Sequence, residues 1–301
     1  MTILKLEIPG QVEEVTIEWL RHIFIPHGIH VISFSVVGDA RDGRGNLSSL
    51  NRLSLRVKKS DEKSLRQMSI VIKTVPTNPQ LRSYVLRVGY CSNELQMYTK
   101  VLPAINSFLE ERGVSPEKRF QFPVCYYGAE QEGATADDYK CILVLEDLHE
   151  SGFHVPDEGG MKSFDIDQAK IALKEMALLH ASSVAYGKSQ GLTFLRQKFT
   201  KLVRHRSDDP SVDNFINAGF QVTRSLLKET GQPLPEGLFE RLNTLQENAK
   251  EIGAKAFLTE DPRKVNAIRH SDLWFSNVSF QNNSSGRPVK AKWFDFQVIM
   301  C

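Results

Sequence analysis

Three oxygen-bearing side chains near the end of the sequence have the spacing expected of a phosphoryl-transfer site. Asp272 is followed five positions later by Asn277, and Asp295 lies 23 positions after Asp272. Phosphoryl transfer needs a carboxylate that orients the attacking hydroxyl, and oxygen ligands that hold magnesium against nucleotide phosphates. We therefore predict that Asp272 is the catalytic base and that Asn277 and Asp295 are Mg²⁺ ligands.

The spacing of Asp272 and Asn277 is weak evidence when it is taken alone. Aspartate is frequent at turns, where it bonds to nearby backbone, so an isolated Asp272 is more often structural than catalytic. A short pattern of defined positions also arises by chance. The assignment to nucleotide and metal chemistry therefore depends on further residues upstream.

Lys73 and Glu94 are the two upstream residues that complete the pattern. Lys73 stands in the strand-like run VIKTVP, where its neighbours in sequence are mostly apolar, and Glu94 follows 21 positions later in SNELQMY. We expect Glu94 to lie on a helix that packs behind the strand, where its carboxylate holds the lysine ready for nucleotide phosphates. The structural alternatives are a strand lysine that extends to solvent and a solvated helix glutamate.

Two further segments are candidates for binding the rest of a nucleotide. The loop GDARDGRGNLSS is rich in glycine, and we expect its backbone amides and the hydroxyls of Ser48 and Ser49 to cover the phosphates. The run LVLEDL ends the last strand of the first half of the chain. We expect backbone groups from Glu146 to Leu148 to pair there with the adenine of ATP.

The remaining candidate side chains have structural alternatives that the sequence favours. We expect His180 to satisfy a hydrogen bond in the core and His270 to brace the loop around Asp272. Trp274, two positions after Asp272, either contacts a substrate or packs in the core, and packing is the commoner role of a large aromatic side chain.

The first half of the sequence has the pattern of an antiparallel sheet with flanking helices. Alternation and β-branched residues predict strands at 30–38, 49–58, 68–75, 122–128 and 140–148. A short amphipathic helix is expected at 16–25 with Thr16 as its cap. A longer helix is expected at about 83–111, with a bend at Pro103.

The second half, from about residue 150, is dominated by helical periodicity. We expect a long buried helix after residue 164, with one apolar stripe made of Ile166, Ala169, Leu173, Met176 and His180. Two more helices are expected at about 211–229 and 236–253, before short strands near the end. We predict an α+β fold of two lobes around a cleft, with residues 1–148 forming a nucleotide-binding lobe and residues 149–301 a catalytic lobe.

The composition argues against several other classes of protein. Lysine and arginine (38) nearly balance aspartate and glutamate (36), so no overall field attracts nucleic acid or an anionic membrane. No apolar run is long enough for a signal peptide or a membrane-spanning helix. The four cysteines form no C-x-x-C pair, which favours reduced thiols in the cytosol. We expect a cytoplasmic protein with no nucleic-acid, membrane or obligate protein partner.

Taken together, these motifs resemble those of the ecdysteroid kinase-like family, relatives of choline and aminoglycoside kinases within the protein-kinase-like fold. The landmarks occur in order as GNLSSLNRLSLRV, IVIKTVP, SNELQMYTKVLP, CILVLEDL, MALLHASSVAYG, IRHSDLWFSNVSF and WFDFQ. The resemblance implies that Lys73 and Glu94 anchor phosphate, that Asp272 is catalytic, and that Asn277 and Asp295 bind Mg²⁺. It also implies ATP-dependent phosphorylation of a small-molecule hydroxyl, with ecdysteroids as a known substrate class.

Two features depart from the pattern of that family. Ser271 stands where the family usually has glycine, and its backbone is strained if that position needs a positive φ. The sequence also ends six residues after Asp295, at Cys301, so we expect the catalytic lobe to lack its terminal helices. The alternative function is therefore a catalytically silent pseudokinase that binds nucleotide or a protein partner.

Overall fold

The computed structural model describes most of the chain in two compact units. The described residues are 7–40, 47–60, 62, 64–156, 163–193, 195–202, 210–231, 233–257 and 265–300. By their internal contacts, residues 1–203 and 266–299 form one unit and residues 204–265 form the second. The predicted boundary between lobes at residue 148 falls inside the first unit and stays a prediction.

A five-stranded antiparallel sheet is the framework of the first unit. Its strands are β1 (Ile29–Asp39), β2 (Ser49–Lys59), β3 (Arg66–Thr74), β4 (Cys125–Gln131) and β5 (Lys140–Glu146). They are arranged in the order β1-β2-β3-β5-β4, and every neighbouring pair is antiparallel. The five predicted strands and their antiparallel pairing are confirmed.

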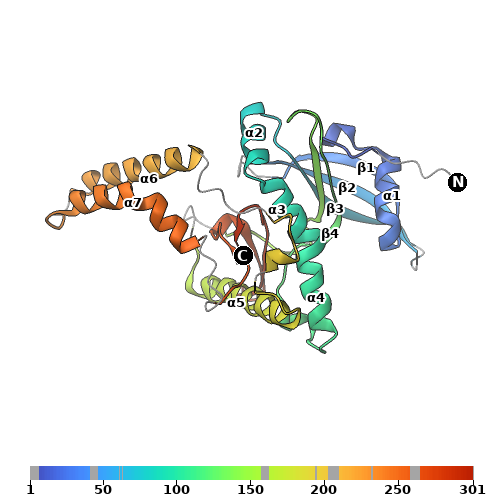
Figure 1. The fold of residues 1–301 in the computed structure, drawn as a ribbon. Helices are drawn as coiled ribbons and strands as arrows, with labels where there is room; N and C mark the ends of the chain where they lie inside the picture. Colours follow the sequence, from blue (N-terminus) through green and yellow to red (C-terminus); the bar gives the residue numbers. More distant parts are fainter. Residues whose placement is uncertain are drawn as a thin grey trace. The chain divides into compact units, whose positions relative to one another are not determined.

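Helix α1 (Ile17–Phe24) covers one face of this sheet, as Figure 1 shows. The Thr16 side chain accepts a hydrogen bond from the Trp19 N–H at 3.2 Å, which satisfies one of the free amides at the start of the helix. Trp19, Leu20 and Phe24 are buried against the inward side chains of the strands. The predicted helix and its cap are confirmed.

Three consecutive helices follow β3 where the sequence predicted one, and the middle helix contacts β4 and β5 of the sheet. They are α2 (Pro79–Arg87), α3 (Tyr90–Gln96) and α4 (Leu102–Glu110). Gly89 has φ +76° and separates α2 from α3 with a backbone conformation that glycine adopts without a steric penalty. A π-helical turn, Met97–Val101, joins α3 to α4 just before Pro103, which has no N–H for a helical hydrogen bond.

Helix α5 (Ile166–Ser189) is the long helix that the sequence predicted, but its buried face is different. Asp165 caps it and forms a reciprocal capping box with Gln168. Ile166 and Leu173 are 73% and 66% exposed, so the predicted apolar stripe is wrong at these two positions, although its member Met176 is buried. The buried side chains are Ala172, Glu175, Met176, Leu179, Ser182, Ser183 and Tyr186. This buried face combines apolar side chains of the core with the polar side chains of Glu175, Ser182 and Ser183.

Short strands follow at the end of the first unit and carry the loop that contains Asp272. They are β6 (Arg269–His270), β7 (Val278–Asn282), β8 (Pro288–Trp293) and β9 (Ile299–Met300). Strands β7 and β8 pair as an antiparallel hairpin. The Trp293 indole N–H donates to the carbonyl of Ala172 at 3.1 Å, which fixes β8 against α5.

The second unit is a pair of helices, α6 (Pro210–Glu229) and α7 (Leu238–Phe257). Both helices agree closely with the prediction. Lys250 forms an ion pair with Asp213 at 3.0 Å, and Arg224 donates to the Asn243 amide oxygen at 2.7 Å. Across the described parts of both units, no helix is long and apolar enough to cross a membrane.

Candidate functional site

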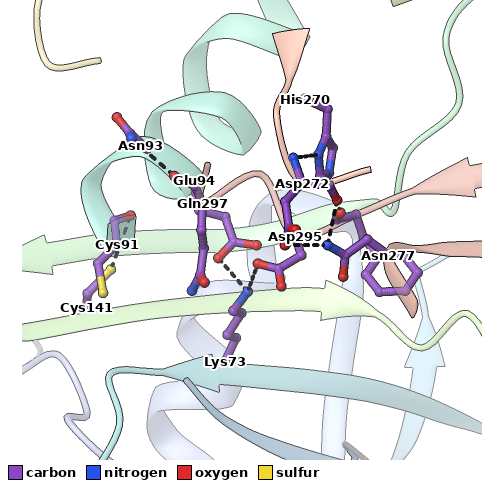
Figure 2. A network of polar contacts seen from close by, with 11 residues as sticks. Lys73, Cys91, Asn93, Glu94, Cys141, His270, Asp272, Asn277, Asp295 and Gln297 are labelled. Atoms are coloured by element: carbon purple, nitrogen blue, oxygen red, sulfur yellow. Dashed lines mark hydrogen bonds and ion pairs between the residues drawn. The ribbon is translucent and has the colours of Figure 1, made fainter. Parts of the chain in front are cut away.

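Lys73 occupies the centre of the candidate site because of the alternation of side chains along β3. Ile70 and Ile72 belong to the cluster packed beneath α1, so Lys73 lies on the opposite face, towards α3. Its ammonium group is 2.7 Å from Glu94 Oε2 and 2.8 Å from Asp295 Oδ1. Figure 2 shows both carboxylates directed at the Lys73 amine. The predicted pairing of Lys73 with Glu94 is therefore present, and the exposed alternatives for both residues are wrong.

Burial and charge act in opposite directions on this ion-paired group. Lys73 is 7% exposed and Glu94 is 2% exposed. Burial lowers the pKa of Lys73, but the charges of Asp295 and Glu94 outweigh it, and the pKa is raised above its usual value. Burial raises the pKa of Glu94 to about 7, against the opposing charge of Lys73. Lys73 therefore stays cationic at neutral pH although its side chain is buried.

Asn277 and His270 hold Asp272 in place. The Asn277 side-chain nitrogen donates to the Asp272 carbonyl at 3.0 Å and to its carboxylate at 2.9 Å. His270 Nε2 donates to the Phe294 carbonyl at 2.8 Å, and its Nδ1 accepts from the Asp272 N–H at 3.4 Å. These partners define a neutral imidazole with its proton on Nε2. Burial lowers the pKa of His270 and favours the same neutral form. The contacts match the bracing role that we expected for His270.

The backbone is unusual at Asp295 and ordinary at Ser271. Asp295 has φ +63° and is the one non-glycine residue of the described chain with a positive φ. Aspartate tolerates this left-handed conformation better than most residues, and such conformations are concentrated at functional sites. Ser271 therefore does not need the conformation that would favour glycine, and its N–H donates to the Val298 carbonyl at 2.8 Å.

A cavity of about 460 Å³ connects these groups. The predicted site residues that line it are Ser48, Lys73, Glu94, Glu146, Leu148, Asp272, Asn277 and Asp295. Ser49 is not among the lining residues; it begins β2 and pairs with Thr74 of β3. Residues 41–46 of the predicted phosphate loop lie outside the described residues. The structure thus gathers residues from both halves of the sequence around one space.

The segment after β5 has fewer backbone groups available for adenine than the sequence suggested. The Glu146 N–H donates to the Val124 carbonyl at 2.8 Å, and the Leu148 carbonyl accepts from the Phe153 N–H at 2.8 Å. The Glu146 carboxylate accepts from Lys292, with distances of 2.7 and 2.8 Å from its two oxygens to Nζ. Of the groups that we proposed for adenine, the Glu146 carbonyl and the Leu148 N–H are the better candidates.

The side chain of Asp147 is a part of this site that the sequence analysis missed, since it considered only the backbone there. It is 4% exposed, and its Oδ2 accepts from Arg52 Nε and from the Ser69 hydroxyl, each at 2.7 Å. Its Oδ1 accepts from the His149 N–H at 3.1 Å. Asp147 therefore ties β2 and β3 to the segment that follows β5. Its place between Glu146 and Leu148 was the available signal.

The oxygen atoms of Asn277 and Asp295 fit a magnesium ion that takes its other ligands from phosphate and water. Both hydrogen bonds to Asp272 come from the Asn277 nitrogen, which leaves the amide oxygen as the atom that can bind a metal. Asp295 adds carboxylate oxygens, and magnesium prefers oxygen ligands, with few of them from protein. Among the described residues, no cluster of three His, Cys, Asp or Glu side chains is arranged to hold a metal by itself.

Comparison with known proteins agrees with the sequence motifs and with this geometry. A search of curated proteins gave no match. The model of the ecdysteroid kinase-like family matches residues 42–301, a span that contains every predicted site residue. The antiparallel sheet followed by a mainly helical part is the α+β, kinase-like fold that the resemblance implied. The chain belongs to the ecdysteroid kinase-like family.

Proposed function

We propose that this protein binds Mg·ATP in the cavity around Lys73 and transfers the γ-phosphate to the hydroxyl of a small molecule. The observation that carries the proposal is the pairing of a buried lysine with Glu94 and Asp295, in the cavity that Asp272 and Asn277 also line. Family membership supports a kinase-like activity in general terms. The nucleotide, the metal and the acceptor are our proposal.

Lys73, Asn277 and Asp295 are the residues that would hold the nucleotide phosphates and the metal. The Lys73 ammonium is positioned by two carboxylates and would bind phosphate oxygens as a point charge. The Asn277 amide oxygen and the Asp295 carboxylate would bind magnesium. When bound, the metal neutralises charge on the phosphate oxygens, which is the main electrostatic requirement of phosphoryl transfer.

Asp272 would orient the acceptor hydroxyl and accept its proton. Its side chain is exposed to the cavity, while the Asn277 amide fixes one carboxylate oxygen. The loop that carries Asp272 is attached to Phe294, next to Asp295, through the His270 side chain. The proposed base and the proposed metal ligand are therefore held in one hydrogen-bonded assembly, which fixes the approach of the hydroxyl.

Thermal unfolding with and without nucleotide tests the binding step. We expect ATP with MgCl₂ to raise the unfolding temperature, and ATP with EDTA to have a much smaller effect, because a ligand that binds only the folded state stabilises it. Asp295→Asn should abolish the part of the rise in unfolding temperature that depends on magnesium. Asparagine tolerates the positive φ of Asp295, so this substitution removes the charge with little backbone strain. A wild-type protein that ATP and magnesium do not stabilise would contradict the proposal.

Turnover tests the transfer step. Wild-type protein and Asp272→Asn should be incubated with ATP, magnesium and an ecdysteroid, choline or an aminoglycoside, and the products analysed by mass spectrometry. We expect one acceptor to gain a phosphate with the wild-type protein, and the rate to fall by about 100-fold or more with Asp272→Asn. If ATP binds but no acceptor is phosphorylated, the protein is a catalytically silent nucleotide-binding protein.

A further inference from the structure

Trp274 is a large aromatic residue that lies outside the core. It is 43% exposed and lines the cavity two positions after Asp272. The other two tryptophans of the chain, Trp19 and Trp293, are 3% and 2% exposed. Core packing, the alternative that the sequence favoured, therefore does not account for Trp274. An exposed indole beside the proposed base is available to contact a ligand.

The loop holds Trp274 at this position. The Asn277 N–H donates to the Trp274 carbonyl at 3.1 Å, within the single turn Phe275–Asn277. The indole packs edge-on against the Phe275 ring, with ring centroids 5.0 Å apart and planes at 70°. Ser276 and Asn277, which follow directly, are buried. A contact surface that is already ordered loses little conformational entropy when a ligand binds.

The lining of the cavity has too few free carboxylates for a polycationic acceptor. Four acidic side chains of the lining contact three cations of the chain itself: Glu94 and Asp295 share Lys73, Glu146 pairs with Lys292, and Asp147 pairs with Arg52. Among the described lining residues, this leaves the Asp272 carboxylate without a cationic partner. A polycationic alcohol would need further carboxylates, so a neutral molecule with an apolar framework fits the lining better.

We propose that Trp274 is a specificity-determining residue for the acceptor. Its indole provides the apolar surface on which the carbon framework of a neutral alcohol lies, while the hydroxyl of that alcohol reaches Asp272. The inference rests on the proposed function, since Asp272 is the base there. When a flat apolar framework lies on the indole, both lose contact with water. This burial favours binding of such an acceptor over binding of a small hydrophilic one.

Tryptophan fluorescence reports this contact independently of activity. Because Trp274 is the exposed tryptophan, acrylamide should quench its fluorescence selectively. The difference between the fluorescence of the wild-type protein and that of Trp274→Phe gives the component contributed by Trp274. We expect ecdysone, as a neutral probe, to lower the quenching constant of that component about twofold or more, with or without a magnesium complex of a non-hydrolysable ATP analogue. Choline, as a small cationic probe, should leave it unchanged. Equal protection by both probes, or none by ecdysone, overturns the inference.

Kinetics with matched variants test the effect on specificity. For the acceptor that is phosphorylated, we expect Trp274→Ala to raise KM about tenfold or more with kcat within about threefold, and Trp274→Phe to retain most of the affinity. Leu273→Ala is the control, because Leu273 is 47% exposed, adjacent in sequence and absent from the described cavity lining. Its KM should match that of the wild-type protein. An unchanged KM in Trp274→Ala overturns the inference.

The two proposals fail in different ways. If ATP and magnesium do not stabilise the wild-type protein, the proposed function fails, whatever the fluorescence shows. If the nucleotide analogue alone protects Trp274 from acrylamide, Trp274 belongs to the nucleotide site. The inference about the acceptor is then wrong, while the proposed kinase activity stands.

Discussion

The Lys73 ammonium joins two carboxylates that come from distant parts of the chain. Asp295 lies 222 positions after Lys73 and bonds to the same nitrogen as Glu94. Removing one partner of a buried ion pair leaves a charge without compensation, which is costlier than replacing the whole pair.

Lys73→Met should destabilise the protein by about 3–5 kcal/mol at pH 8, because Glu94 loses its counter-charge in a buried site. The loss should shrink as the pH falls. The pKa of Glu94 in the folded state lies above the usual 4.5, so as the pH falls the folded state binds a proton before the unfolded state does. Protonation of Glu94 therefore raises the free energy of unfolding. Urea unfolding in EDTA between pH 8 and pH 5 measures this trend.

The double variant Lys73→Met with Glu94→Gln is the control for that prediction. With no carboxylate at position 94, it should be more stable than Lys73→Met at pH 8, and its stability should vary less between pH 8 and pH 5. Equal instability of the single and double variants at pH 8 would show that the charge of Glu94 does not cause the loss.

His270 should make the stability of the wild-type protein fall with acid. Burial lowers its pKa below the usual 6.5, so below that pH the unfolded state binds a proton that the folded state resists. The slope contributed by one such group is at most about 1.4 kcal/mol per pH unit. His270→Gln should flatten the stability profile below pH 6.5 in denaturant unfolding. A variant with the wild-type slope would contradict this assignment.

At the scale of elements, the breaks between helices position the site. Glu94 lies on α3, which begins after Gly89 as a helix separate from α2, and from there its carboxylate reaches Lys73. Apolar periodicity runs through the whole region 83–111, so the sequence pattern did not distinguish one helix from three. The breaks occur at Gly89, with φ +76°, and at the π-helical turn before Pro103.

Gly89→Ala should destabilise the protein by about 1–2 kcal/mol, because alanine is strained at a positive φ. It should also weaken the magnesium-dependent stabilisation by ATP, since the strain acts on the start of the helix that carries Glu94. Gly187→Ala is the matched control. Gly187 lies inside α5, and an added Cβ there meets Leu195 at an ordinary 3.7 Å. Thermal unfolding should show no loss for Gly187→Ala, and an equal loss in both variants would contradict the argument.

At the scale of the whole molecule, the two units differ in how much they bury. The sheet and the helices of the first unit contain both apolar clusters of the described residues. In α6 and α7 of the second unit, no described side chain is buried. Local stability follows buried apolar contact, so the two units should open with different free energies.

Hydrogen exchange should therefore separate the two units. We expect amides in the middle of α6 and α7 to exchange at least about tenfold faster than amides of β3 and β5, because the helix pair opens without exposing a core. Mass spectrometry of peptides from wild-type protein at neutral pH measures this difference. Protection of α6 and α7 equal to that of β3 would show that the helix pair is stabilised by contacts beyond those within its own unit.

Local patterns along the chain were enough to predict the strands, most of the helices and the residue types of the candidate site. Alternation and β-branched residues indicated the strands because their side chains pack against the apolar clusters, and the segment from His270 to Asn277 carries its own hydrogen bonds between Asp272 and Asn277. The pairing of Lys73 with Glu94 also followed from a strand and the helix behind it. The hydrogen bonds within the Asp272 loop depend on near neighbours, which the order of residues records directly.

Long-range packing decided the rest. It brought Asp295 to Lys73, buried Asp147 with Arg52, selected an inner face of α5 that mixes apolar and polar side chains, and left Trp274 at the cavity instead of in the core. Each of these outcomes depends on how elements far apart in the sequence pack together. No local pattern encodes such contacts, because their energy arises only when distant surfaces meet and exclude water.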